Sequence, residues 1–118
     1  MSDPNDRQDL SPLSPAVFHV LLALAQGDKH GYAIMQDVAA TTEGRIRMGP
    51  GTLYGTIKRM LQAGLILETD ERPDPELDDE RRRYYRLTDL GSKAAHTEAR
   101  RLSSLVVVAK RRGLAVAN

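Results

Sequence analysis

Residues 49–66 read Gly-Pro-Gly-Thr-Leu-Tyr-Gly-Thr-Ile-Lys-Arg-Met-Leu-Gln-Ala-Gly-Leu-Ile, and this stretch has the pattern of an amphipathic helix. The proline near its start is compatible with the first turn of a helix, and Gly64 suits the turn that ends one. Four apolar side chains between them fall within an arc of about 100° at the helical angle per residue, so they form one buried face. They are Leu53, Ile57, Met60 and Leu61. The stretch therefore predicts a helix over residues 51–64.

The opposite face of this helix is small, polar and cationic. Geometry sends six residues to that side, with Tyr54 at its boundary. The six are Gly51, Thr52, Gly55, Lys58, Arg59 and Gln62. A helix with small residues at its start, two cations further along and no acid can enter the major groove of double-stranded DNA, and its first backbone N–H groups suit a phosphate. The competing interpretation is a solvated surface helix.

Two amphipathic stretches precede this helix. Ser14 and Pro15 form a helix start, and apolar residues at helical spacing follow them as far as Gly27. After a short turn, a second helix is predicted to end near Gly44. Residues 45–48, Arg-Ile-Arg-Met, alternate charged and apolar side chains and predict a small edge strand.

Beyond these helices the apolar pattern becomes that of strands. Residues 65–69 and 83–88 are rich in β-branched, aromatic and leucine side chains, and they flank an acidic segment with two prolines, which predicts a hairpin with a long tip. Thr88 and Asp89 then cap a last helix that is predicted to run to about Arg112. This order of elements predicts a mainly α fold with a small β-hairpin wing, a winged helix-turn-helix followed by a C-terminal dimerisation helix.

The predicted elements divide the chain into four parts. We expect a mobile N-terminal arm over residues 1–13, a winged-helix DNA-binding domain over 14–88, a C-terminal dimerisation helix over 89–112 and a tail over 113–118. The 118 residues, 41% hydrophobic and 28% charged, have the composition of one soluble domain. No apolar run approaches the roughly 20 residues that a bilayer requires, and the polar, acidic start does not resemble a signal peptide. The sequence therefore predicts a cytoplasmic protein with no membrane partner.

The net charge of +1 conceals a segregation of charge along the chain. Residues 70–80 contain seven acids and one base, which leaves 16 basic against nine acidic residues elsewhere. The body of the domain is therefore basic. Four arginines follow the acidic segment, and strand alternation sends some of them to each face. They are Arg81, Arg82, Arg83 and Arg86. A solvated charged face is the alternative explanation of this run.

The sequence offers no set of catalytic or metal-binding groups. The absence of cysteine excludes disulfides, thiolate catalysis and cysteine-based metal sites. His19, His30 and His96 are not grouped with carboxylates or with each other at ligand spacing, so we expect them to be surface or capping residues. The sequence predicts that the protein is not an enzyme and has no catalytic residue, no cofactor and no metal.

Three segments carry a family resemblance. They are His-Gly-Tyr-Ala-Ile at residues 30–34, the helix and following residues at 51–66, and Arg-Tyr-Tyr-Arg-Leu-Thr-Asp-Leu-Gly at 83–91. In this order, and over residues 14–91, the chain resembles the short form of the PadR family of bacterial transcriptional regulators. The resemblance implies a dimeric DNA-binding repressor.

The resemblance also implies roles for particular residues. Thr52 and Tyr54 are expected to approach the DNA together with Lys58 and Arg59, whereas Tyr32 is expected to be a packing residue. Wings of this family are commonly basic at the tip, but this one is acidic and would repel phosphate, so we do not expect it to enter the minor groove. The full predicted DNA-binding set is Gly51, Thr52, Tyr54, Gly55, Lys58, Arg59, Arg81, Arg82 and Arg83.

The last predicted helix carries more apolar surface than one chain can cover. Residues 105–108 are four consecutive apolar residues that surround the helix, whereas one protomer covers only part of its circumference. We therefore expect a symmetric homodimer and an inverted-repeat operator with half-sites about ten base pairs apart. The predicted interface residues are Leu102, Leu105, Val106 and Ala109. Leu102, Val106 and Ala109 continue a heptad stripe from Ala95 and Ala99, and Leu105 begins the apolar run. Packing within one chain explains Ala95 and Ala99 equally well.

Some short members of the family capture flat aromatic drugs between tryptophans at the dimer centre. This chain has no tryptophan and a single phenylalanine, Phe18, so that mode is not expected here. A small-molecule effector would instead use tyrosine side chains or an aliphatic pocket. The alternative to a DNA-binding repressor is a winged-helix module that binds another protein without touching DNA, with the acidic residues 70–80 as its contact.

Overall fold

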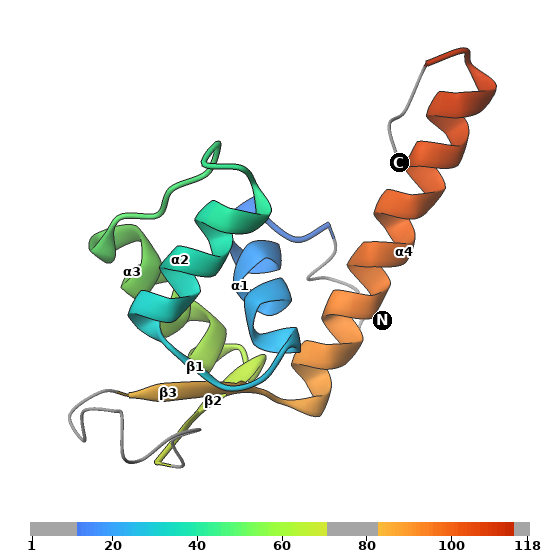
Figure 1. Ribbon diagram of the computed structural model, residues 1–118. Helices are drawn as coiled ribbons and strands as arrows, with labels where there is room; N and C mark the ends of the chain where they lie inside the picture. Colours follow the sequence, from blue (N-terminus) through green and yellow to red (C-terminus); the bar gives the residue numbers. More distant parts are fainter. Residues whose placement is uncertain (1–11, 71–82, 115–118) are drawn as a thin grey trace.

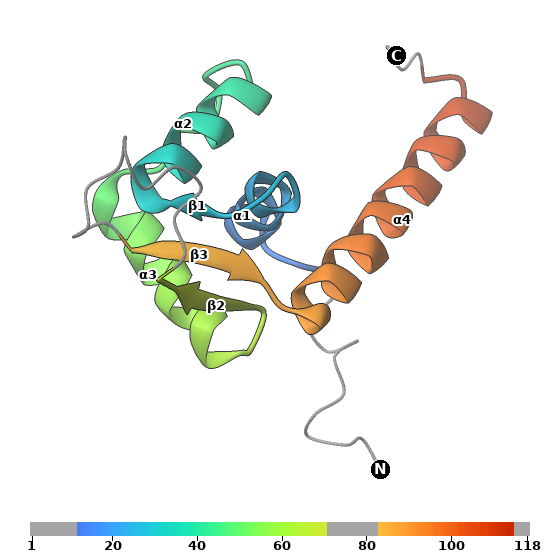
Figure 2. The ribbon, with the colours of Figure 1, turned by 60° about the horizontal axis from the view of Figure 1, so that its bottom comes forward.

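Figure 1 shows a computed structural model of the chain, which describes residues 12–70 and 83–114. Three helices pack together: α1 (Pro15–Ala25), α2 (Gly31–Thr41) and α3 (Pro50–Gln62). They lie beside a small sheet, and the long helix α4 (Asp89–Arg111) leaves the sheet and projects past them, as Figure 2 shows from a second side.

The sheet has three antiparallel strands in the order β1-β3-β2. The predicted hairpin is present as β2 (Ile66–Thr69) and β3 (Tyr84–Leu87), with Ile66 opposite Leu87. The third strand, β1 (Lys29–His30), pairs with the other edge of β3 at the place where the sequence predicts only a turn. Together these elements form the predicted winged helix-turn-helix, with a strand at Lys29–His30 that the sequence does not predict.

The core lies between α1, α2, α3 and the sheet. Its fully buried side chains include Leu21 of α1, Ile34 of α2, and Leu53 and Met60 of α3. Tyr85 of β3 is buried against the same cluster. Burying a large aliphatic side chain stabilises the fold by roughly 1.5–3 kcal/mol, so these residues fix which face of α3 points outward.

Side chains cap the starts of three helices. Ser14 and Thr88 each accept a hydrogen bond from the backbone N–H three residues further on, at 3.2 and 3.0 Å, as the sequence predicts. His30 Nδ1 accepts the Ala33 N–H at 3.1 Å and begins α2, which confirms the capping role expected for a histidine. Gly49 precedes α3 and offers no side chain to cap it.

The prediction of an edge strand over residues 45–48 is wrong, because these residues form no strand. The alternation of exposed and buried side chains is present, and Met48 reaches the core. The backbone of Ile46, however, bonds to a side chain: its N–H donates to Thr42 Oγ1 at 3.1 Å, and Thr42 Oγ1 lies 3.3 Å from the Ile46 carbonyl oxygen. Because Thr42 takes the place of a neighbouring strand, the segment is a loop between α2 and α3.

An ion pair joins the sheet to the turn after α1. Arg86 of β3 donates from Nε to both oxygens of Asp28 at 3.1 Å and from Nη2 at 2.7 Å. A bidentate pair of this kind fixes geometry as well as charge. It holds the turn that leads into β1 and α2, and thereby orients α2.

The start of α4 is held tightly against the residues that follow α3. Thr88 donates its N–H to the Leu65 carbonyl at 3.1 Å and its hydroxyl to the Gly64 carbonyl at 2.6 Å. A Cβ at Gly91 would collide with that same Leu65 carbonyl oxygen, so only glycine fits there. Within residues 12–70 and 83–114, no helix is both long enough and apolar enough to cross a membrane.

Candidate nucleic-acid interface

The predicted orientation of α3 is confirmed. Leu53, Ile57 and Met60 are at most 2% exposed, and Leu61 packs partly against the core. Thr56, which the sequence pattern does not single out, is also fully buried. The remaining side of the helix forms what we call the outer face of α3: Gly51, Thr52, Tyr54, Gly55, Lys58, Arg59 and Gln62, all exposed except the half-buried Gly55.

The glycines of the outer face are not required by the chain's own packing. A Cβ placed on Gly51 would have no atom within 4 Å, and one on Gly55 would meet only Arg59 Nη1, at an ordinary 3.7 Å. Glycine inside a helix costs about 1 kcal/mol relative to alanine. Since no contact among the described residues explains this cost, the bare surface at Gly55 suits close approach by a molecule outside the domain.

Tyr54 connects the outer face to α2. Its side chain is 48% exposed, and its hydroxyl lies against Gly31, where a Cβ would overlap it. Burial raises the pKa of Tyr85, in β3, above the ordinary value of 10.0. The charges of Glu68 and Tyr54 raise this pKa further, whereas the charge of Arg83 lowers it. Tyr54 is therefore held in place by the first residue of α2 and is still accessible from outside.

The two cations of the outer face lie on its opposite flanks. Lys58 and Tyr54 are four residues apart and share one flank. Arg59 lies on the other flank and is steadied by a hydrogen bond from Nη2 to Thr56 Oγ1 at 3.2 Å. The outer face thus presents positive charge on both sides of a strip of small residues.

Of the three predicted DNA-binding arginines of the wing, one lies within the described residues. Arg83 is described, and its exposed guanidinium lies 3.8 Å from the Glu68 carboxylate. At this distance and exposure an ion pair contributes little. Arg81, Arg82 and most of the acidic segment lie outside the described residues.

Sequence reasoning missed exposed residues next to the outer face. Arg45 and Arg47 are exposed in the loop between α2 and α3, where the sequence predicts a strand. Tyr32 was expected to pack, but it is 57% exposed and lines a groove of about 250 Å³ with Arg47 and Met48. The position of Arg45 and Arg47 before the exposed helix could have indicated them, since this turn adjoins nucleic acid in helix-turn-helix proteins.

The predicted dimer residues lie on the projecting part of α4. Leu102, Leu105 and Val106 are 37%, 52% and 38% exposed, and Ala109 is partly exposed. We call these four residues the apolar stripe of α4. At the helical angle per residue the stripe continues the line of Ala95, which packs against the core, so one face is covered by the domain at its start and uncovered further along.

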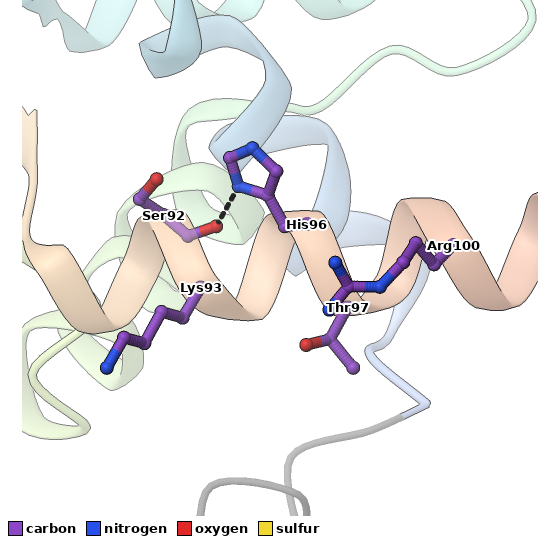
Figure 3. A pocket seen from close by; sticks show the side chains of 5 residues that line it. All are labelled: Ser92, Lys93, His96, Thr97 and Arg100. Atoms are coloured by element: carbon purple, nitrogen blue, oxygen red, sulfur yellow. Dashed lines mark hydrogen bonds between the residues drawn. The ribbon is translucent and has the colours of Figure 1, made fainter.

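The polar side of α4 carries a broad hollow of about 520 Å³, shown in Figure 3. His96 Nδ1 lies 2.8 Å from the Ser92 carbonyl oxygen, while Lys93 and Arg100 extend in different directions. These groups come from one helix and do not converge on a common point. Among the described residues, no three His, Cys, Asp or Glu side chains are grouped so that they could hold a metal ion. His96 is exposed as expected, and His19 is partly exposed on α1.

Comparisons with known proteins agree with this architecture. The PadR-like family of transcriptional regulators matches residues 20–97. An uncharacterised 37.1 kDa protein of transposon TN4556 from Streptomyces fradiae is 35% identical over 86 residues, which are 73% of this chain. The chain spans 22% of the length of that relative.

Solved structures share the fold at low sequence identity. A transcriptional regulator from Clostridium thermocellum is 21% identical, with a TM-score of 0.67 over 94% of this chain and 97% of the other. A PadR family regulator from Clostridium difficile is 22% identical, with a TM-score of 0.68 over 83% and 97%. Bacillus subtilis PadR in complex with operator DNA is 21% identical, with a TM-score of 0.58 over 73% and 47%.

Proposed function

Because the chain belongs to the PadR-like family of transcriptional regulators, we propose that it is a repressor that binds an inverted-repeat operator as a homodimer, with α3 in the major groove. The observation that carries the proposal is the outer face of α3, which is exposed, cationic on both flanks and free of acids. The structure of Bacillus subtilis PadR, which shares the fold, is a complex with operator DNA and supports the DNA-binding part of the proposal.

Each residue of the outer face has a proposed role. Gly51 and Gly55 let the helix approach the base edges closely, and Thr52 and Tyr54 supply hydroxyl groups for bases or phosphates. Lys58 and Arg59 contact phosphates on either side of the groove. The wing arginines Arg81, Arg82 and Arg83 are assigned to the flanking backbone.

The apolar stripe of α4 is the proposed dimer interface. Leucine and valine side chains that are more than a third exposed on a projecting helix are stabilised when a second copy covers them. A two-fold axis at this helix would place two copies of α3 in successive major grooves, with half-sites about ten base pairs apart.

The same proposal includes the division of the chain. Residues 14–88 bind DNA, residues 89–112 join the two copies, and residues 1–13 and 113–118 are an arm and a tail. It also includes a cytoplasmic location and release from DNA by a small-molecule effector.

Selection from random duplexes with the purified full chain tests the proposal. We expect enrichment of an inverted repeat, and an affinity that falls steeply as salt rises. Lys58→Ala is expected to weaken binding about tenfold and to reduce the salt slope by about two, one for each copy in the dimer. Lys93→Ala is the matched control, because it removes the same charge from the polar side of α4 and should leave binding unchanged.

Failure to enrich any repeat would contradict the repressor proposal. Equal losses for Lys58→Ala and Lys93→Ala would show that binding depends on overall charge and not on the outer face. The first result would favour the protein-binding module as the function of this chain.

A further inference from the structure

A cleft of about 210 Å³ lies between the start of α1 and the second half of α3. Its walls are mostly aliphatic. Met60 and Leu65 are nearly fully buried, while Leu13, Val17 and Ala63 are partly buried around them. The volume is below the roughly 300–1,000 Å³ of clefts that take drug-sized ligands, so a smaller molecule fits.

Arg59 borders this cleft and is the only charged side chain among the described residues that line it. A guanidinium has five N–H donors in a planar fork that matches a carboxylate, and the bond to Thr56 uses one nitrogen of that fork. An apolar wall with one guanidinium at its edge is complementary to a molecule with a hydrocarbon body and a single negative charge.

The ends of two helices also adjoin the cleft, and their effects oppose each other. α1 begins at Ser14, so the positive end of its dipole lies there, whereas α3 ends beside Ala63 with the negative end of its own. Each end is equivalent to about half an elementary charge. Because these two partial charges are opposite in sign and each smaller than the full charge of Arg59, the guanidinium is the strongest charge at the cleft.

We propose that this cleft binds a medium-chain aliphatic carboxylate. The hydrocarbon chain packs against Leu13, Val17 and Met60, and the carboxylate accepts hydrogen bonds from Arg59. The lining residues that the structure describes include no aromatic ring on which a planar ligand could stack, which favours a flexible aliphatic chain.

The position of Arg59 gives the ligand a consequence for DNA binding. Arg59 belongs both to this cleft and to the outer face of α3. A bound carboxylate would occupy the guanidinium that a phosphate needs, and it would add a negative charge beside the DNA. This consequence rests on the proposed function, whereas binding of the carboxylate itself does not.

Octanoate titrated into the full chain without DNA tests the cleft alone. Methyl NMR signals of Leu13, Val17 and Met60 are expected to shift and to saturate. Octanol, which has the same chain length and no charge, is expected to bind about fivefold more weakly, as suits one charge-assisted contact at an exposed arginine. Arg59→Gln should bring the affinity for octanoate down to that for octanol.

A matched pair of variants locates the site. Ala63→Phe fills the cleft and should lower the affinity for octanoate at least tenfold. Ala39→Phe makes the same change in the groove of about 250 Å³ beside α2 and should leave the affinity unchanged.

Equal affinities for octanoate and octanol would overturn the proposal, as would methyl shifts confined to other parts of the domain. Nuclear Overhauser contacts between residues 1–11 and Val17 in the ligand-free chain would also overturn it, because the chain itself would then fill the cleft. Saturable octanoate binding without selection of any duplex would leave the cleft established and the repressor function wrong.

Discussion

Two helices leave one face uncovered, and the two faces differ in chemistry. The outer face of α3 carries glycine, threonine and cations, which water solvates well, so this face is stable in a single chain. The apolar stripe of α4 carries leucine and valine side chains, for which exposure to water is unfavourable. The outer face of α3 therefore suits a transient polyanionic partner, and the apolar stripe of α4 suits a permanent apolar one.

The largest expected effect comes from placing a charge in the apolar stripe. Leu105→Glu should raise the dimer dissociation constant at least about 100-fold, close to 3 kcal/mol, because an unpaired carboxylate would be buried at the interface. Sedimentation equilibrium measures this directly. Val107→Glu is the control, since Val107 is 44% exposed but lies on the other side of the helix. A dimer that tolerates Leu105→Glu as well as Val107→Glu would show that the stripe is not the interface.

A pair of glycine substitutions sharpens the contrast between the two helices. Gly91→Ala should lower the free energy of unfolding by about 2–3 kcal/mol, because its Cβ would displace the Leu65 carbonyl. Gly51→Ala should change it by no more than about 0.5 kcal/mol, because the space there is open. Urea denaturation compares the two variants, and equal losses would contradict the packing described here.

Gly55→Ala separates stability from binding on the outer face of α3. Removing a helical glycine should raise the free energy of unfolding by about 0.5–1 kcal/mol. The added methyl group should nevertheless weaken binding to the selected duplex about tenfold, because it stands where the DNA must approach. Denaturation and fluorescence anisotropy measure the two effects on the same protein. A variant that is more stable and binds with full affinity would mean that the DNA does not approach this side of α3.

The smallest expected effect is the dependence of the free energy of unfolding on alkaline pH through Tyr85. The raised pKa of Tyr85 means that the fold favours the neutral phenol. Its contribution to stability is therefore fully present below pH 10 and is lost as the pH rises through the higher pKa of the folded state. The free energy of unfolding measured from neutral pH to above pH 10 should fall less for Tyr85→Phe than for the parent chain. Tyr32→Phe, on an exposed tyrosine, should follow the parent, and parallel curves for all three would refute the assignment to Tyr85.

The sequence predicts the helices well because their signals are local. The apolar spacing of Leu53, Ile57 and Met60 fixes the orientation of α3, and Ser14 and Thr88 mark helix starts through side chains within three residues of their partners. The pairing of β1 with β3 joins residues more than 50 positions apart, and two residues are too few to carry a strand pattern.

The candidate site is predictable from the sequence only where its signal is local. The outer face of α3 follows from periodicity alone. The exposure of Tyr32 and Arg47 does not, because it depends on how the loop held by Thr42 packs beside α2. The cleft that includes Arg59 also lies beyond sequence reasoning, since α1 and α3 form it together.

The contact between Gly91 and the Leu65 carbonyl has a mechanical consequence. The Leu65 carbonyl, which follows α3, contacts both Thr88 and Gly91 at the start of α4. This contact fixes the angle between the two helices. Inserting one residue between this joint and the apolar stripe would rotate the stripe by about 100° and advance it by about 1.5 Å. The contact between Gly91 and Leu65 would therefore determine the spacing between two copies of the protein along a duplex.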